Sequence, residues 1–314
     1  MEFKAPRGTS DHLPELKSNW NKIEIIARET ARSFGYNEIT TPVFEQTSLF
    51  KRAVGEGTDV VTKEMYNLTD LGGNEFTLRP EGTAPVCRAF VEHGMHNLPY
   101  PLRLFYIEPM FRHERPQSGR MRQHHQFGVE IFGDNSPEAD AEIILVGLTY
   151  LKKLGIKNLK LRLNSIGNKN SRERFRKEFL DYFSTMKNDL PEIDKKKFDL
   201  NPIRILDSKE KITMDLILKS PKPIEFLDDE SKKHWDKLQI IINKIIDQFN
   251  DVDLVIDHNL VRGLDYYSMT VFEIEPASRS EKSQASILSG GRYDNLISHI
   301  GGPDTPAAGF GSGI

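Results

Sequence analysis

Two strand-like segments on either side of a polar loop constrain the fold of this chain more than any other feature. Residues Leu102–Arg112 and His125–Phe132 have the composition of β-strands, and the loop between them is polar and contains glycine. Consecutive strands joined in this way predict an antiparallel hairpin. Shorter strands are expected at Phe76–Arg79 and Glu38–Phe44, and Pro42 implies that the latter is interrupted or lies at an edge. Strands and helices do not alternate regularly, so we predict an α+β fold with an antiparallel β-sheet flanked by helices.

The clearest helix is expected at Pro137–Leu154. Ser136 is a suitable N-cap, and proline is well tolerated at the first helical position. Gly155 follows two lysines of the last turn, as at many helix ends. A first helix is expected near Ser18–Phe34, where apolar residues recur at helical spacing. Gly35 then suits the left-handed residue past the helix end.

The middle of the chain has a different pattern and reads as a mostly helical insertion over residues 168–250. Two apolar stripes at helical spacing define it, namely Phe175, Phe179, Phe183 and Met186, and then Trp235, Leu238, Ile242, Ile245 and Phe249. Residues 1–167 and 251–314 then form the two parts of the main domain. In the second part, short strands are expected at 252–256, 270–275 and 285–288, broken by the glycine pairs 290–291 and 301–302.

Composition excludes several classes of protein. The chain is 38% hydrophobic and 28% charged, as in globular proteins with a real core. No signal peptide opens the sequence, and no apolar run approaches the roughly 20 residues that span a bilayer. One cysteine, Cys87, allows neither an intrachain disulfide nor a thiolate metal cluster. We therefore expect a cytoplasmic protein with no membrane partner. The net charge of -3 leaves nucleic-acid binding open, since that needs only a local basic surface.

The segment Arg79–Thr83 presents a carboxylate and a hydroxyl at the end of a predicted strand. Glu81 and Thr83 are suitable partners for an ammonium group, because both offer oxygen acceptors. The alternative is that Thr83 is simply the N-cap of a helix through Phe90. On these residues alone the cap is preferred, because threonine favours that position.

The predicted hairpin carries four arginines, at positions 112, 115, 120 and 122. Arginine forks match phosphate oxygens, and strands hold such side chains firmly. A solvated hairpin tip explains Arg120 and Arg122 without any ligand. It explains Arg112 less well, because Phe111 and Met110 beside it have the character of core residues.

A third polar cluster is Arg262–Tyr267, which contains an arginine, an aspartate and two tyrosines. Tyrosine hydroxyls can bond an imidazole nitrogen, and Arg262 can neutralise a developing anion. Structural tyrosines at a sheet edge are an equally good interpretation. The glycine-rich stretches Ser289–Asp294 and Gly309–Gly313 fit neither a dinucleotide-binding nor a phosphate-loop motif.

Taken together and in this order, these segments resemble the histidyl-tRNA synthetases, a branch of the class II aminoacyl-tRNA synthetases. The similarity begins at Pro6–Asp11, which looks like the amino-terminal signature of that family. Ile39–Glu45 is similar to the first class motif, which builds the dimer interface. The arginine-rich hairpin looks like the second motif, the ATP loop. Arg262–Tyr267 and Ser289–Asp294 resemble two segments particular to the histidine enzymes.

The resemblance implies the class II catalytic fold and a histidine--tRNA ligase. Such an enzyme activates L-histidine with ATP, giving histidyl-adenylate and pyrophosphate, and transfers histidine to the 3′ end of tRNA(His). ATP is then a substrate, Mg²⁺ accompanies it, and a homodimer is the expected assembly. No metal ligands are assigned to particular residues.

The resemblance also implies site residues. Those that bind histidine are Glu81, Gly82, Thr83 and Gln126 near its α-amino group, and Glu130, Tyr266, Tyr267 and Tyr293 near its imidazole. Those that bind ATP are Arg112, Glu114, His124 and Arg262, of which Arg112 and Arg262 are the catalytic residues. His124 stands where the family usually has a phenylalanine stacked on adenine, which leaves less apolar area for stacking.

Two further expectations concern parts outside the cleft. The chain ends at Ile314, where a Glu-Arg pair of the third class motif is expected, and the C-terminal anticodon-binding domain is expected to be absent. Weak or absent ATP activation by this polypeptide alone follows. The insertion matches in position a domain that contacts the tRNA acceptor arm. Its candidate phosphate contacts are Lys195, Lys196, Lys197, Lys209 and Lys211, although a lysine run is commonly a solvated face.

The main alternative is a non-catalytic paralogue, the histidine-binding regulatory subunit of ATP phosphoribosyltransferase. That protein shares the fold and lacks an anticodon-binding domain. The complete Arg262–Tyr267 segment and the unbroken arginine hairpin argue against it, because a sensor of histidine does not require them.

Overall fold

A computed structural model describes residues 3–115, 120–208, 210–277 and 286–314. Its centre is an eight-stranded sheet in the order β1-β5-β6-β11-β10-β9-β7-β8. The strands are β1 (Asn37–Glu38), β5 (Leu102–Phe111), β6 (Gln123–Phe132), β7 (Leu159–Gly167), β8 (Val252–Ile256), β9 (Ser268–Pro276), β10 (Leu288–Arg292) and β11 (Ala307–Gly313). Neighbours pair antiparallel except for β1 with β5 and β7 with β8. The predicted α+β fold and the β5–β6 hairpin are confirmed.

A second, antiparallel sheet contains β2 (Phe44–Gln46), β4 (Glu75–Leu78) and β3 (Tyr66–Thr69). The strand predicted at Glu38–Phe44 is divided between the two sheets, so the prediction of one continuous strand is wrong. The implied interruption at Pro42 is right, because proline lacks the amide hydrogen that a continuous ladder needs.

The long helices agree with the sequence patterns. Helix α1 (Pro14–Ser33) begins earlier than predicted, and Gly35 after it has φ +81°. Helix α4 (Pro137–Lys153) starts where predicted, and the Ser136 hydroxyl accepts the Ala139 amide at 3.4 Å. The shorter helices of the main domain are α2 (Thr47–Val54), α3 (Thr83–Glu92) and α9 (Leu296–His299). Within the described residues, no helix is long and apolar enough to cross a membrane.

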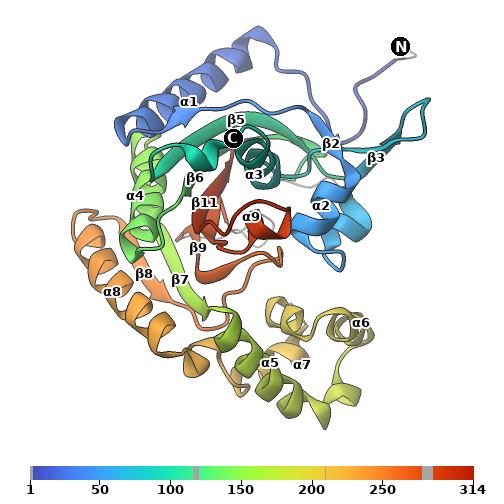
Figure 1. Ribbon diagram of the computed structural model, residues 1–314, viewed down its shortest axis with the longest axis vertical. Helices are drawn as coiled ribbons and strands as arrows, with labels where there is room; N and C mark the ends of the chain where they lie inside the picture. Colours follow the sequence, from blue (N-terminus) through green and yellow to red (C-terminus); the bar gives the residue numbers. More distant parts are fainter. Residues whose placement is uncertain (1–2, 116–119, 209, 278–285) are drawn as a thin grey trace.

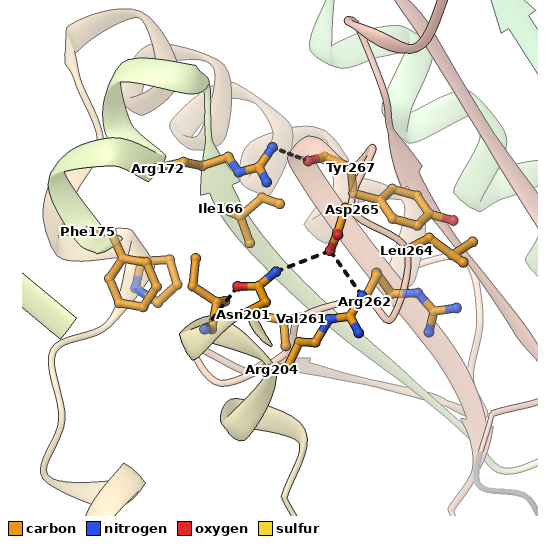
Figure 2. Close-up of a pocket in the computed structure, with 12 residues that line it drawn as sticks. Ile166, Arg172, Phe175, Asn201, Arg204, Val261, Arg262, Leu264, Asp265 and Tyr267 are labelled. Carbon is orange, nitrogen blue, oxygen red and sulfur yellow. Dashed lines mark hydrogen bonds and ion pairs between the residues drawn. The ribbon is translucent and has the colours of Figure 1, made fainter. Parts of the chain in front are cut away.

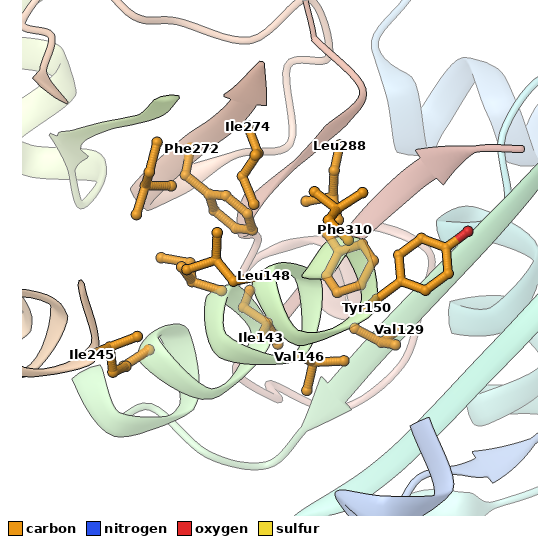
Figure 3. Close-up of a cluster of buried hydrophobic side chains, with 14 of the residues drawn as sticks. Val129, Ile143, Val146, Leu148, Tyr150, Ile245, Phe272, Ile274, Leu288 and Phe310 are labelled. Atoms are coloured by element: carbon orange, nitrogen blue, oxygen red, sulfur yellow. The ribbon is translucent and has the colours of Figure 1, made fainter. Parts of the chain in front are cut away.

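Helix α4 covers one face of the large sheet, and the main hydrophobic core lies between this helix and the sheet. Figure 3 shows Ile143 and Leu148 of this helix close to Phe272 of β9 and Phe310 of β11. Ile245 of helix α8 (Asp229–Ile246) belongs to the same cluster. Burial of this apolar surface holds α4 and α8 on the sheet.

The insertion has a hydrophobic core of its own, formed by helices α5 (Lys169–Ser184), α6 (Glu192–Leu200) and α7 (Lys211–Leu218). Figure 1 shows these helices gathered at one end of the molecule. Phe175, Phe179 and Phe183 are buried there as expected. Helix α8 packs on α4 instead, and its apolar side chains belong to the hydrophobic cluster of the large sheet. The sequence pattern could not show whether α8 packs on the insertion or on α4, because an apolar stripe does not identify the surface that it contacts.

The expected break at Gly290-Gly291 is wrong, because both residues lie inside β10. A Cβ atom on Gly290 would lie 2.2 Å from the Gly309 carbonyl oxygen, and one on Gly291 would lie 2.3 Å from that of Thr270. These glycines allow neighbouring strands to approach closely, as strand glycines can. Of the strand predicted at 285–288, Ala285 lies outside the described residues.

Candidate active site

An open cleft lies beside the large sheet, at the end where β6, β10 and β11 meet the segment 262–267. Its empty volume is about 1560 Å³, which includes open space at its mouth. The side chains and backbone that line it belong to Glu81, Thr83, Arg112, Glu114, Arg120, Met121, His124, Gln126, Arg262, Leu264, Tyr266, Tyr267, Ser286, Ile287, Ser289, Gly311, Gly313 and Ile314. The cleft therefore offers ligands charged side chains of both signs.

Glu81 stands at the start of α3 and is 3% exposed. Its carboxylate accepts the backbone amides of Thr83 at 2.8 Å and Ala84 at 2.9 Å. Glu81 is thus the residue that caps α3, and the interpretation of Thr83 as the cap is wrong, although the helix begins there. Burial raises the pKa of Glu81, against the effect of these two amides. A nearby ammonium group would stabilise its charged form.

Gln126 of β6 faces the same cleft, and its side-chain oxygen is buried without a hydrogen-bond partner. An acceptor in this state costs about 1–3 kcal/mol unless a ligand or water satisfies it. Its position is fixed by Gly311 of β11, where a Cβ atom would lie 1.8 Å from the Gln126 amide nitrogen. Gln126 and Glu81 together offer oxygen acceptors to a ligand that donates hydrogen bonds.

Glu130 of β6 is fully buried and is not among the residues that line the cleft, so its direct contact with histidine stays a prediction. Its oxygens are taken by two hydroxyls, that of Thr83 at 2.8 Å and that of Tyr293. Tyr293 lies equally deep. Burial raises the pKa of Glu130 to about 8, although these hydroxyls favour the charged form. Glu130 and Tyr293 thus support the cleft from behind Thr83.

Gly82 also lies behind the wall, where a Cβ atom would be 2.3 Å from the Tyr106 ring. Glycine is therefore needed for close packing between α3 and β5. Tyr266 and Tyr267, in contrast, line the cleft as expected, with their ring centroids 4.7 Å apart.

The arginine hairpin forms another wall. The Arg112 Nε donates to the Pro80 carbonyl oxygen at 2.7 Å, which holds its guanidinium beside Glu81. Glu114 pairs with Arg120 at 3.3 Å, and Arg120 lines the cleft, contrary to the interpretation of a merely solvated tip. Burial, with Arg112 nearby, lowers the pKa of His124 to about 4, so this ring is neutral at physiological pH.

Other parts of the hairpin lie away from the cleft. Arg122 donates to the Glu114 carbonyl oxygen at 3.2 Å, and Arg115 is exposed. Residues 116–119 at the hairpin tip lie outside the described residues.

Arg262 also lines the cleft and is held by a chain of ion pairs. Its guanidinium contacts the Glu273 carboxylate and donates to the Ser289 hydroxyl at 2.6 Å. The other oxygen of Glu273 lies 3.4 Å from Arg162, which also contacts Asp257. The Nε of Arg262 is buried without a hydrogen-bond partner. The fold therefore fixes this cation and leaves one donor for an anionic ligand.

Sequence reasoning missed Glu273 and Ser289, which orient Arg262. A signal was present for Glu273, because a carboxylate inside the apolar run of β9 requires a partner. Leu264, Met121 and Ile287 of the cleft wall carried no comparable signal, since apolar residues have no pattern specific to a site.

The sequence matches one family model, described as Histidyl-tRNA synthetase, over residues 8–168 and 219–314. The unmatched residues 169–218 correspond to helices α5 to α7. Over 316 residues the chain is 43% identical to a protein named Histidine--tRNA ligase from Streptococcus mutans, covering 100% of this chain and 72% of that protein. A protein of the same name from Picosynechococcus is 45% identical over 312 residues, covering 99% and 72%.

Solved structures of proteins with the same family name are also similar to this chain. The apo histidyl-tRNA synthetase of S. aureus superposes with a TM-score of 0.78 at 34% identity, covering 99% of this chain and 72% of that chain. A Bacillus halodurans protein, titled an ATP phosphoribosyltransferase regulatory subunit/histidyl-tRNA synthetase, gives a TM-score of 0.70 at 25% identity, covering 100% and 82%.

Proposed function

The chain belongs to the histidyl-tRNA synthetase family, and on this premise we propose that its cleft binds histidine beside ATP and catalyses their condensation. The products are histidyl-adenylate and pyrophosphate, and the histidyl group then passes to the 3′ end of tRNA(His). The observation that carries the proposal is the gathering of Glu81, Gln126, Arg112 and Arg262 on one cleft. These residues are remote in sequence and complementary to a free amino acid next to a phosphate.

The amino-acid end of the cleft is proposed to lie at Glu81 and Gln126. An α-ammonium group there would donate to the unpartnered Gln126 oxygen and would favour the charged form of Glu81. Thr83, Tyr266 and Tyr267 would contact the imidazole, with Glu130 and Tyr293 forming the base of that subsite. Because a site built to bond both ring nitrogens leaves polar groups stranded around an apolar side chain, it rejects such analogues by roughly 10⁴-fold.

The chemical step needs alignment and charge more than a protein nucleophile. The histidine carboxylate attacks the α-phosphorus of ATP, so two anions approach each other. Arg112 and Arg262, which both line the cleft, would each neutralise part of this charge, and both are already oriented by the fold. The neutral His124 ring would stack on adenine, and Glu114 would accept from its amino group.

Mg²⁺ would enter with ATP and supply further positive charge on the phosphates. Within the described ranges, no group of three or more His, Cys, Asp or Glu side chains is arranged to hold a metal ion. We therefore assign no side chain to Mg²⁺.

The regulatory-subunit alternative is served by the same histidine subsite, and one relative is titled with both names. We favour the ligase because the chain is more similar to proteins named as ligases and because the phosphate side of the cleft carries two oriented arginines. A histidine sensor alone has no need of these arginines.

Histidine-dependent exchange of labelled pyrophosphate into ATP tests the proposal. We expect a signal that requires histidine and disappears in Arg262→Gln. In Glu130→Ala we expect a strongly raised KM for histidine. Pyrophosphate exchange that does not depend on histidine, or an unchanged KM for histidine in Glu130→Ala, would contradict the proposed histidine subsite. Histidine binding without any exchange would favour the sensor.

Three wider properties stay predictions. We infer a homodimer, a cytoplasmic location and contact between the insertion and tRNA. Of the candidate lysines, Lys196 is exposed, Lys197 lies 3.8 Å from Asp194, and Lys209 lies outside the described residues. Light scattering measures the dimer, and the salt dependence of tRNA binding measures the phosphate contacts.

A further inference from the structure

A second cavity, which we call the joint pocket, lies between the insertion and the segment 261–267. Its empty volume is about 530 Å³, which includes open space at its mouth. Figure 2 shows Arg172 and Phe175 of the insertion on one side and Val261, Asp265 and Tyr267 of the main domain on the other. The joint pocket is distinct from the cleft but shares a wall with it.

Arg172 of α5 is a cation of the joint pocket that has no carboxylate within ion-pair distance in the described part of the chain. One guanidinium nitrogen donates to the Tyr267 carbonyl oxygen at 2.9 Å. Burial lowers the pKa of Arg172, although Asp265 acts in the opposite direction. A half-buried guanidinium with one neutral partner has donors left for an anion.

Arg204 belongs to the 3-10 helix η4 (Pro202–Asp207) and extends from the insertion to the main domain. Its Nη1 donates to the Gly57 carbonyl oxygen, and its Nη2 lies 3.5 Å from Asp265. The Nε and Nη2 atoms are buried without a hydrogen-bond partner. Asp265 also accepts from Asn201 at 3.3 Å. Asp265 thus pairs with Arg204 but not with Arg172, so these two guanidinium groups and one carboxylate leave a net positive charge in the joint pocket.

Much of the remaining wall is apolar and includes Ile166, Phe175 and Val261. Water alone would satisfy the arginines but would gain no partners from this surface, and apolar cavities are poor water sites. A ligand that carries an anionic group on an apolar body matches both parts. Arginine forks suit a carboxylate in particular, because two parallel hydrogen bonds form.

We propose that the joint pocket is a second ligand site, which binds a small organic monoanion with its carboxylate at Arg172 and Arg204 and its apolar body on Phe175. Arg262, Leu264 and Tyr267 line both the joint pocket and the cleft. A ligand in either cavity therefore contacts the same segment. The inference stands on these contacts alone and does not depend on the proposed function.

Benzoate is a suitable probe, and benzamide is its neutral counterpart of the same shape. We expect saturable benzoate binding in a saturation-transfer NMR titration. Benzamide should bind at least about tenfold more weakly, or by about 1.4 kcal/mol, since it cannot form the charge-assisted hydrogen bonds of a carboxylate. In crystals soaked with 4-bromobenzoate, the anomalous peak of bromine is expected beside Phe175. A peak elsewhere, no saturable binding, or equal affinity for benzamide would overturn the proposal.

Variants locate the site in solution. Arg172→Met should weaken benzoate binding about tenfold or more, because it removes charge-assisted bonds of this strength. Arg176→Met, an exposed change one turn further along α5, should bind as the unchanged protein does. Arg112→Gln in the main cleft should also bind normally. Loss of binding in Arg112→Gln but not in Arg172→Met would place benzoate in the main cleft and refute the proposal. If Arg172→Met does not fold, the bromine position decides.

Discussion

Glu130 and Asp140 are both fully buried carboxylates, and their surroundings are opposite. Asp140, at the start of α4, lies 2.6 Å from the guanidinium of Arg292. Glu130 has no such cation among its hydrogen-bond partners in the described residues and receives the hydroxyls of Thr83 and Tyr293. Burial would raise the pKa of both groups. At Asp140 burial is outweighed by Arg292 and His234 together, so its pKa is lowered, whereas that of Glu130 rises to about 8.

This difference indicates that Asp140 stabilises the fold, whereas Glu130 belongs to the candidate active site. Asp140 joins three elements, because it also accepts from Thr270 of β9 at 2.5 Å and contacts His234 of α8 at 2.8 Å. Its hydrogen-bonding capacity is used within the protein. Glu130 stands behind the cleft with weaker partners, and such perturbed carboxyl groups are concentrated at functional sites. Changes at the two should therefore affect different properties.

The largest effect on stability is expected at Asp140, the carboxylate that is paired with Arg292. Arg292→Met should lower the free energy of unfolding by about 3–5 kcal/mol, because it leaves Asp140 charged and buried without its cation. Arg103→Met is the control, since its pair with Glu142 is about one quarter exposed and should contribute under about 1 kcal/mol. Urea unfolding measures both. Equal losses of unfolding free energy in Arg292→Met and Arg103→Met would contradict the structural role proposed for Asp140.

A smaller, pH-dependent effect is expected at Glu130. Its pKa is raised on folding, from 4.5 to about 8, so the folded state binds the proton more tightly. Stability should therefore fall as pH rises through this window, and Glu130→Gln should remove that loss. We expect Glu130→Gln to gain about 1–3 kcal/mol relative to the unchanged protein between pH 5 and pH 8. Parallel stability curves would show that Glu130 is not neutral in the folded protein.

The smallest effect is expected at Glu273, which orients Arg262 from behind. Glu273→Gln keeps the shape but weakens the ion pair, so ATP affinity should fall about tenfold at most, or about 1.4 kcal/mol. Histidine affinity should stay unchanged, because Glu81 and Gln126 are untouched. Calorimetric titration of each ligand separates the two. A loss of histidine affinity as large as that of ATP would mean that Glu273 supports the whole cleft.

The sequence predicted the elements with local signals and missed arrangements that depend on tertiary contacts. Helix α4 was found because Ser136, the following proline and Gly155 mark its ends. Gly290 and Gly291 were expected to end a strand, whereas the close approach of β9 and β11 places them inside one. The apolar stripe of α8 was recognised, but its partner α4 was not.

The same difference between local signals and tertiary contacts holds for the candidate active site. Residues within the recognised segments, such as Arg112, Gln126 and Arg262, do line the cleft. The depth of Glu130 could not be predicted, because a sequence does not state which side chains cover a residue. Arg172 and Arg204 of the joint pocket lie in the insertion, outside every recognised motif, and only folding brings them to the segment 261–267.

The central claim is that the cleft holds free histidine through Gln126 and the groups around it. Titration calorimetry of L-histidine into the unchanged protein, Gln126→Leu and the exposed control Lys196→Ala tests it directly. We predict one histidine per chain, binding about tenfold or more weaker in Gln126→Leu, and no change in Lys196→Ala. Equal histidine affinity in all three proteins, or no binding to the unchanged protein, would contradict the account.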